Sequence, residues 1–553
     1  MKIIQAIPPK QSKDTVAAID LEIFGMSSKQ LHRPQGTFAA LGVSFDGKTV
    51  YVITEEKDVK KTLRNINSCV WVFHNAQFDI AHLRRWAKIS PRKSNKMYCT
   101  LILERILWGG YYDAFSLKAL TRRYLLTLLE KDTRSEFEES TELTTKQQKY
   151  LASDVVATFK IFEKQMVLLN NDRGSQNTWQ KIDAPALWAT LDMKGMRINT
   201  NRWADLAAHH ATTAETIRED LGFNPGSPKQ TLNMLSKLGI RIPNTRAQQL
   251  EKHKSNPIVK KVLQYREAAK RASTYGERFM GKFIESDGRV YSSWRVCGAE
   301  TGRMASREPN LQNIPNEKTF RQCFEAPKGS LLIIADFEQQ EPRVTAHLSQ
   351  DPELLDAFKK NRDIHLEVTR TIFHDPKIKK SDNRRKIGKM VNLAVTYGMS
   401  AGSMANRLKI PEDEAQSFLT AYFRRYSAVY TWSKKLKADA RKKGYIRTLA
   451  GRKRYLNFYS VRWQNIATNT PVQGSAADIT KLALARIHKK YPAENFPVVA
   501  VIHDEIVAET TKKEVKKLSD DIVEAMEWAF RQVAPTIKGE VEVATGKTWA
   551  AKS

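Results

Sequence analysis

The stretch Leu331–Ser349, LLIIADFEQQEPRVTAHLS, decides the fold predicted for the second half of this 553-residue chain. Its opening apolar run is short and rich in β-branching, which predicts a strand that delivers Asp336 at its tip. A second stretch, Val498–Val507 (VVAVIHDEIV), predicts a hairpin with acids at its bend. If these strands are neighbours, Asp336 and Asp504 converge and can bind two metal ions about 3.5–4 Å apart, as phosphoryl transfer requires. Taken singly, each motif is equally typical of acidic residues in a solvent-exposed turn.

A third stretch, RRKIGKMVNLAVTYG at residues 384–398, places cations before apolar residues on one face of a predicted helix. Spacings of four residues bring onto that face Arg385, Lys389, Leu393 and Tyr397. The two cations can grip a triphosphate, while the apolar end meets a sugar and a base. For this pattern alone, a solvated basic face that turns into core is the alternative.

In this order, the three stretches resemble the polymerase motifs of family A DNA polymerases, the DNA polymerase I type. The resemblance extends to ETGR (300–303), PNLQNIP (309–315), GYIRTLAGR (444–452) and PVQGSAAD (471–478), and it is nearly continuous from about Ser227 to the C-terminus. It implies an α/β multidomain fold, in which a ribonuclease H-like exonuclease domain is followed by a right-hand polymerase of thumb, palm and fingers.

Composition agrees with a protein that binds a polyanion. The formal net charge is +31 and the pI about 9.8, although charge alone does not separate a nucleic-acid enzyme from a packaging protein or a membrane-surface binder. With 41% hydrophobic residues, the chain is globular rather than a disordered basic tail. The four cysteines lack pair spacing, which argues against zinc and a disulfide framework and favours a reducing cytosol. No segment approaches about 20 apolar residues, so we expect no membrane anchoring and a cytoplasmic location, in the host cell if the protein is phage-encoded.

Four acids and a tyrosine near the N-terminus form a second candidate site. Asp20 and Glu22 lie two apart on a predicted strand and so project to one side, and a second apolar run precedes Asp79. Tyr150 and Asp154 lie four apart on a predicted helix. Each alone is typical of a cap, a turn or a surface acid. Together they could build a two-metal site that activates water against a phosphodiester.

As an ordered set, these residues resemble the DEDDy-type 3′→5′ exonuclease that often precedes the polymerase in this family. The resemblance implies that the four carboxylates ligate metal and that Tyr150 positions water. Because this region begins at the N-terminus, the 5′-nuclease domain of some family members is expected to be absent.

The expected domain organisation follows the resemblance. The apolar period is lost between Leu168 and Asn177, which predicts an exonuclease domain at 1–175 and a polymerase domain at 176–553. The polymerase is expected to comprise a thumb at about 180–286, palm segments at about 287–350 and 485–553, and fingers at about 351–484. Thumb connections look too short for an inserted domain that would clamp a processivity partner.

The resemblance also implies roles for single residues. Glu505 is a secondary carboxylate, and Arg303 reaches the primer side of the minor groove. Asn469 and Gln473 contact the template, and His503 lies at the primer terminus. Amides there test base-pair shape, because the minor groove offers acceptors common to all sequences.

Glu341 matches the position that closes against the sugar 2′ position, which argues against an RNA polymerase or a reverse transcriptase. Two departures lie at the substrate end: Leu393 stands where relatives usually have Phe or Tyr, and Asn465 where many have Arg. We expect a group of basic residues at the surface, with no assigned role beyond attraction to phosphate: His365, His374, Lys377, Lys379 and Lys380.

The sequence thus predicts a DNA-directed DNA polymerase with proofreading, which extends a primer 3′-OH with dNTPs. The expected cofactor is Mg²⁺, two ions per active site, with Mn²⁺ as an alternative. The expected partners are primer-template DNA and dNTPs, the expected state is a monomer, and any replisome partner is unidentified. The compact layout resembles a bacteriophage replicative enzyme. The rival class is a DNA-binding or DNA-degrading protein with one decayed site, and intact acids at both sites argue against it.

Overall fold

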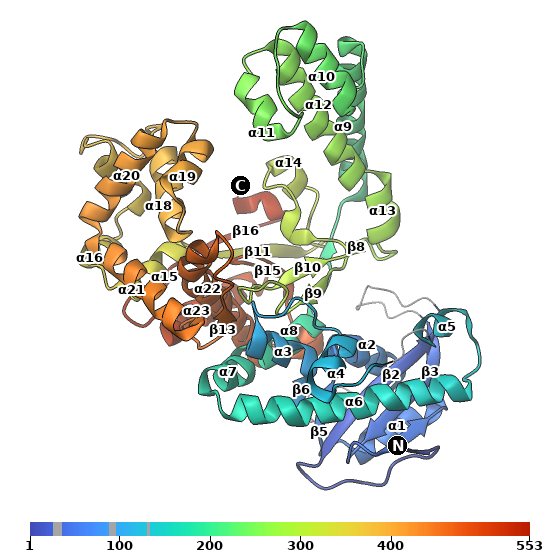
Figure 1. Ribbon diagram of the computed structural model, residues 1–553. Coiled ribbons are helices and arrows are strands. Elements are labelled where there is room, and N and C mark those ends of the chain that lie inside the picture. The colour runs from blue at the N-terminus through green and yellow to red at the C-terminus, as the bar shows by residue number, and fades with distance from the viewer. Residues whose placement is uncertain (26–35, 88–95, 130–132, 553) are drawn as a thin grey trace.

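The computed structural model describes residues 1–25, 36–87, 96–129 and 133–552. Figure 1 shows an N-terminal sheet covered by helices, a group of helices at the top of the view, and a second sheet flanked by further helices. This mixed arrangement confirms the predicted α/β multidomain class.

The N-terminal body is built on a six-stranded sheet in the order β1-β4-β3-β2-β5-β6. Its central strand β2 (Val16–Phe24) runs antiparallel to β3 (Thr37–Ser44) and parallel to β5 (Val70–Phe73). Along β2, Asp20 and Glu22 are half-buried while their neighbours are buried, so both acids share one face as predicted. The outer strands are β1 (Lys2–Ile4), β4 (Thr49–Ile53) and β6 (Lys96–Cys99).

The long helix α6 (Thr145–Asn170) crosses this sheet and carries Tyr150 and Asp154, as the sequence predicts. It begins with a capping box, in which the Thr144 side chain accepts from the backbone of Gln147 and the Gln147 side chain caps the backbone of Thr144. Gly42 on β3 permits the close approach, since a Cβ there would lie 2.7 Å from Cγ2 of Val155. The other helices of this body are α1 (Glu56–Asn65), α2 (Ala76–Ala87), α3 (Thr100–Trp108), α4 (Leu117–Leu125) and α5 (Thr133–Glu139).

Short helical segments lead from this body to the helices at the top of Figure 1. The connection comprises α7 (Arg173–Asn177), the π-helical turn η2 (Thr178–Asp183) and α8 (Ala184–Asp192). In the upper group, α9 (Thr200–Leu221) packs along α12 (Pro257–Tyr275). Its remaining elements are α10 (Pro228–Lys237), α11 (Ala247–Leu250), η3 (Glu251–His253) and α13 (Glu277–Phe283), and β7 (Met196–Arg197) pairs with β8 (Arg289–Val290) below them.

A four-stranded antiparallel sheet in the order β14-β15-β11-β16 forms the second sheet. The strand β11 (Ser330–Phe337) lies between β15 (Glu505–Thr511) and β16 (Val541–Gly546), and β14 (Val498–Ile502) forms a hairpin with β15. The register places Asp336 opposite Glu505, so the two acidic motifs are neighbours as predicted. The helices α22 (Trp463–Lys490) and α23 (Val515–Val533) pack together and share the core of this sheet.

The helix predicted at 384–398 is α18 (Arg385–Thr396), and it packs on α17 (Ile364–Ile372). Gly388 permits this contact, since a Cβ there would lie 2.0 Å from Oγ1 of Thr369. Around them lie α15 (Gln340–Ser349), α16 (Pro352–Lys359), α19 (Ala401–Leu408), α20 (Glu412–Arg425) and α21 (Ser427–Lys443). Short elements complete the chain: β9 (Ser293–Arg295), β10 (Ala305–Arg307), η4 (Leu311–Asn313), α14 (Lys318–Arg321), β12 (Tyr445–Arg447), β13 (Lys453–Tyr455), η5 (Ala493–Asn495) and η6 (Trp549–Lys552).

Two of the expected domain limits fall inside helices. The limit at 175/176 lies within α7, and the limit at 484/485 lies within α22.

All four cysteines are buried and free of disulfide bonds. Within the described ranges, we find no helix whose length and apolar character would let it cross a membrane.

Candidate active sites

A cavity of about 450 Å³ lies where α15, α18 and α22 meet the bend between β14 and β15. Residues from both acidic motifs and from α18 line it, although they come from distant parts of the sequence. Seven of the predicted site residues are among them: Arg303, Glu341, Lys389, Leu393, Tyr397, His503 and Asp504. The tertiary structure therefore gathers most of the predicted polymerase residues around one space.

Asp336 and Asp504 carry the electrostatic signature of a metal site. Burial and, to a smaller extent, the negative charge of Asp336 together raise the pKa of Asp504 to about 7. Oδ1 of Asp336 is buried and has no hydrogen-bond partner in the described part of the chain, while Oδ2 pairs with Lys552. A buried carboxylate oxygen that has no hydrogen-bond donor is suited to bind a divalent cation such as Mg²⁺.

Glu505 has a different environment from the two aspartates. Its Oε1 accepts a hydrogen bond from Nε1 of Trp549 at 2.6 Å, and its Oε2 accepts one from Arg321 at 3.2 Å. The Arg321 guanidinium also lies over the Trp549 ring, 4.4 Å from its centre. Both oxygens of Glu505 are thus engaged by buried donors. No sequence motif marked Arg321, Trp549 or Lys552, because each is a single residue outside the quoted stretches.

Glu341 is the centre of a polar group at the wall of this cavity. It forms an ion pair with Arg303 through Oε1, and Tyr397 lies close enough to influence its pKa. Burial raises the pKa of Glu341, and the Arg303 charge opposes that rise. Leu393, one turn before Tyr397 on α18, lines the same space and is only partly buried.

The four residues predicted to share one face of α18 do not all line the cavity. Lys389, Leu393 and Tyr397 line the cavity, whereas Arg385 pairs with Asp363 at 2.6 Å, at the start of α17. The expectation that His365 lies on the surface is wrong. It is buried on α17 with 8% of its surface exposed, it lines the cavity, and Asn392 contacts its ring, because α17 packs directly on α18. The other four residues of that expected surface group are exposed: His374, Lys377, Lys379 and Lys380.

The helix α22 places Asn469 and Gln473 one turn apart, with Pro471 between them. Oδ1 of Asn469 is buried and has no hydrogen-bond partner within the described ranges. Asn465, one turn earlier, lies against Gly398 just after α18, where a Cβ on the glycine would approach Cα of Asn465 to 3.3 Å. Leu393 and Asn465 are the two residues that depart from the pattern of the family. Leu393 therefore lies where α18 meets the cavity, and Asn465 lies where the end of α18 meets α22.

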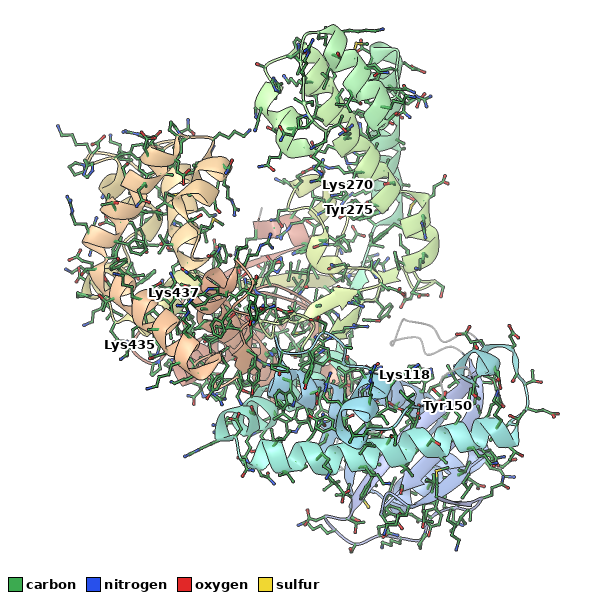
Figure 2. The ribbon with its side chains drawn as sticks, in the orientation of Figure 1. Lys118, Tyr150, Lys270, Tyr275, Lys435 and Lys437 are labelled. Atoms are coloured by element: carbon green, nitrogen blue, oxygen red, sulfur yellow. The ribbon has the colours of Figure 1, made fainter. Side chains whose placement is uncertain are left out.

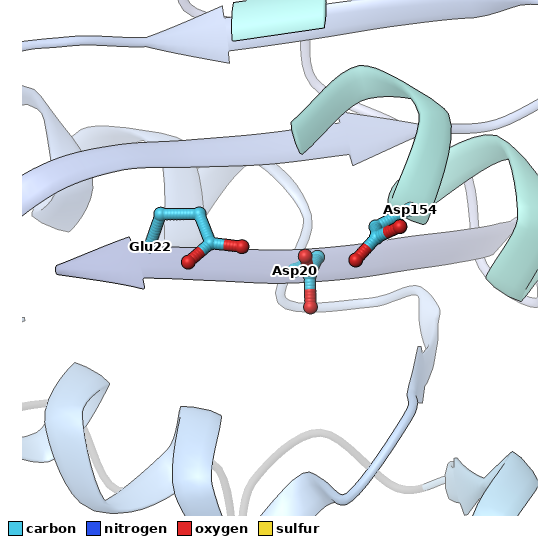
Figure 3. Close-up of side chains that lie close together, drawn as sticks. All are labelled: Asp20, Glu22 and Asp154. Carbon is cyan, nitrogen blue, oxygen red and sulfur yellow. The ribbon is translucent and has the colours of Figure 1, made fainter. Parts of the chain in front are cut away.

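The N-terminal body contains a second cavity, of about 290 Å³, lined by all five residues predicted for an exonuclease site. Ligand atoms of Asp20, Glu22 and Asp154 lie within 4.8 Å of one another, and Figure 3 shows the three carboxyl groups close together. Tyr150 is on the same helix as Asp154 (Figure 2). Burial raises the pKa of Asp79 well above its ordinary value, with the charge of Glu22 adding to the effect. These donors fit divalent metal.

Arginines that the sequence did not mark also face the second cavity. Arg105 on α3 and Arg295 on β9 both line it, so a strand from outside the N-terminal body contributes to this cavity. Burial lowers the pKa of Arg295, and the positive charges of Arg307 and Arg105 lower it further. Cations that repel one another beside a cluster of acids favour a polyanionic substrate.

Comparisons with known proteins cover both halves of the chain. The chain matches the family model described as DNA polymerase family A over residues 197–551, and the model described as 3′-5′ exonuclease over residues 10–170. It is 32% identical over 432 residues to DNA polymerase I of Treponema pallidum, covering 72% of this chain and 43% of that protein. It is 36% identical over 306 residues to the thermostable DNA polymerase I of Thermus aquaticus, covering 53% of this chain and 36% of that protein.

The chain spans less than half the length of these two curated relatives. Among solved structures, it resembles one described as the POL domain of Pol1 from M. smegmatis in complex with DNA primer-template and dNTP. The TM-score is 0.84 at 23% identity, with 97% of this chain and 96% of that chain covered. This likeness concerns the fold.

Proposed function

Since this chain belongs to DNA polymerase family A, we propose that it extends a primer 3′-OH with dNTPs on a DNA template and removes misincorporated nucleotides with a 3′→5′ exonuclease. The observation that carries the proposal is the single cavity in which Asp504 meets Lys389, Leu393 and Glu341, with Asp336 opposite Glu505 on the neighbouring strand. An acidic pair beside a basic helix face suits a reaction between a hydroxyl and a triphosphate.

For synthesis, Asp336 and Asp504 would hold two Mg²⁺ ions. Such ions lower the pKa of the primer hydroxyl and neutralise the leaving pyrophosphate. Lys389 and Arg385 bind the triphosphate, which requires Arg385 to exchange Asp363 for phosphate oxygens. Tyr397 and Leu393 flank the sugar and base.

Duplex contacts fall to residues around the same cavity. Arg303 and His503 face the primer end, and Asn469 and Gln473 present amides to the template strand. Glu341 closes the space at the sugar 2′ position, with Arg303 paired to it and Tyr397 beside it. The basic helix α12, which carries Lys270, belongs to the thumb, and α21, which carries Lys435 and Lys437, belongs to the fingers (Figure 2).

For editing, Asp20, Glu22, Asp79 and Asp154 would hold metal, and Tyr150 orients the attacking water. The cations Arg105 and Arg295 attract the phosphates of a frayed primer strand. The proposal also includes Mg²⁺ as the metal, with Mn²⁺ as an alternative. It further includes a monomeric state, a cytoplasmic location and a role in viral DNA replication. The proposal also keeps the domain limits expected from the sequence, namely the limit at 175/176 and the limits within the polymerase domain.

A primer-extension gel tests this function. The protein with a labelled primer-template, dNTPs and Mg²⁺ is expected to extend the primer, and to shorten a single-stranded primer when dNTPs are withheld. Binding to DNA without extension or shortening in Mg²⁺ would instead favour the DNA-binding protein.

A further inference from the structure

Four charged side chains are fully buried where the N-terminal body joins the polymerase half: Asp183, Arg452, Asp478 and Lys481. Their side-chain exposures are between 0% and 3%. Asp183 ends η2, Arg452 follows β12, and the other two lie on α22. Neither active site uses this cluster.

The four charges are neutralised within the cluster. The Arg452 guanidinium binds both oxygens of Asp183 at 2.9 and 2.8 Å and Oδ1 of Asp478 at 2.8 and 3.0 Å. Lys481 binds Asp183 at 2.5 Å. Burial would raise the pKa of Asp183, but the charges of Arg452 and Lys481 outweigh it and hold that pKa below its ordinary value. Asp183 is thus ionised and fixes the plane of Arg452.

Arg452 in turn supports a tight turn in the polymerase cavity wall. Gly302 in this turn has φ of +85°, and a Cβ there would lie 2.3 Å from Nε of Arg452. The amide of Gly302 donates to the carbonyl of Ala299, and the amide of Gly298 donates to the carbonyl of Arg303, both at 3.0 Å. The turn ends in Arg303, which pairs with Glu341 at the cavity.

We propose that Asp183 is a positioning residue for DNA synthesis: through Arg452 it sets the turn at residues 298–303 and thereby the placement of Arg303. This inference rests on the proposed function and adds that the junction with the exonuclease body, where η2 lies, determines part of the polymerase site. A shift of η2 would move Arg303, although Asp183 touches no substrate.

The test is a double-mutant cycle with Asp183→Asn and Arg303→Ala. Asp183→Asn keeps the shape of the side chain and removes its charge. We expect it to lower kcat for single-nucleotide incorporation about tenfold, to change KM for the dNTP less than about twofold, and to leave degradation of single-stranded DNA within about twofold. In the Arg303→Ala background the same change should cost less than about twofold, because both act through one group. Equal losses in both backgrounds would overturn the proposal.

Glu540→Gln is the matched control. Glu540 pairs with the buried Arg343 at 2.8 Å in the same half of the chain, and the hydrogen bonds of the Arg343 guanidinium go to Glu338, Lys538 and Glu540 rather than to the 298–303 turn. Its effect should be the same with and without Arg303. If Asp183→Asn does not fold, Thr448→Val replaces it, since it keeps all four charges but removes the 2.8 Å hydrogen bond that Oγ1 of Thr448 donates to Asp478 and the 3.1 Å hydrogen bond that it accepts from the Arg452 amide.

A measurement without turnover separates this inference from the proposed function. Amide hydrogen exchange in peptides covering 298–303 should be faster in Asp183→Asn, or in Thr448→Val, than in wild type or Glu540→Gln. Unchanged exchange in this turn overturns the positioning role. Failure of the wild type to extend primers contradicts the proposed function and leaves the exchange result to decide the structural link.

Discussion

Nε1 of Trp549 donates a hydrogen bond of 2.6 Å to Oε1 of Glu505, so the last turn of the described chain supports an acid of the polymerase site. Arg321 takes the other oxygen of Glu505. By contrast, Oδ1 of the neighbouring Asp336 is buried and, among the residues described, finds no hydrogen-bond donor. The acids of this site therefore differ in their freedom to bind a metal ion.

The first prediction concerns this difference. Asp504→Asn should lower the single-turnover rate of incorporation by about a thousandfold or more, because metal binding contributes several kcal/mol to the transition state. Glu505→Gln should lower it about tenfold or less, and Trp549→Phe should act like Glu505→Gln. Losses of equal size for Asp504→Asn and Glu505→Gln would place Glu505 among the metal ligands.

The second prediction is that the two sites are separable, since their acids lie on different sheets. Asp336→Ala should abolish primer extension and leave 3′→5′ degradation of single-stranded DNA within about twofold of wild type. Asp20→Ala combined with Glu22→Ala should do the reverse. Thermal melting of each variant verifies folding, and a folded variant of one site that lacks both activities would argue against two independent centres.

The third prediction follows from the raised pKa of Asp504, which burial and Asp336 bring to about 7 in the absence of metal. Between the unfolded-state value and about 7, the folded protein binds more protons than the unfolded chain, so the free energy of unfolding falls as pH rises through this window. Urea titrations in EDTA between pH 5 and 7.5 should show a smaller fall for Asp504→Asn than for wild type. Mg²⁺ competes with the proton for Asp504, so the affinity of the protein for Mg²⁺ should increase as pH rises over the same window. A pH-independent affinity would contradict this assignment.

The fourth prediction concerns sugar selection by Glu341. Removing this side chain opens space at the 2′ position, so Glu341→Ala should admit ribonucleotides more readily. Tyr397→Phe removes the hydroxyl beside Glu341 and should shift selectivity in the same direction by a smaller amount. The ratio of kcat/KM for deoxy and ribo substrates measures both effects. An unchanged ratio in Glu341→Ala would place the gate elsewhere.

The fifth prediction concerns Leu393, which lines the cavity between Lys389 and Tyr397. Leucine offers no donor to replace a missing 3′-OH, so the wild type should discriminate against dideoxynucleotides. Leu393→Tyr should supply one hydrogen bond, on the order of 1 kcal/mol, and shift the ratio about fivefold. Leu393→Phe is the control, since it adds the ring without the hydroxyl. If Leu393 acts only as core, tyrosine overpacks it and lowers kcat/KM for both substrates alike.

The sequence by itself predicted the class of fold, which its resemblance to family A polymerases implied, and the acids of both candidate sites, which stand in short local patterns. Short β-branched runs specify β2 and β11, and the period of α18 places Lys389, Leu393 and Tyr397 on one face. Side chains two apart on a strand, such as Asp20 and Glu22, share a face regardless of the rest of the chain.

Only the tertiary structure decided which single residues complete these sites. Trp549 reaches Glu505 because η6 packs beside β11, and Arg295 enters the exonuclease cavity because β9 lies next to the N-terminal body. His365 is buried because α17 packs on α18, a contact that its own stretch of sequence does not specify. Such contacts join residues far apart in the chain and leave no periodic signal. The buried group around Asp183 has the same origin, since its charges are tolerable only when chain folding brings all four together.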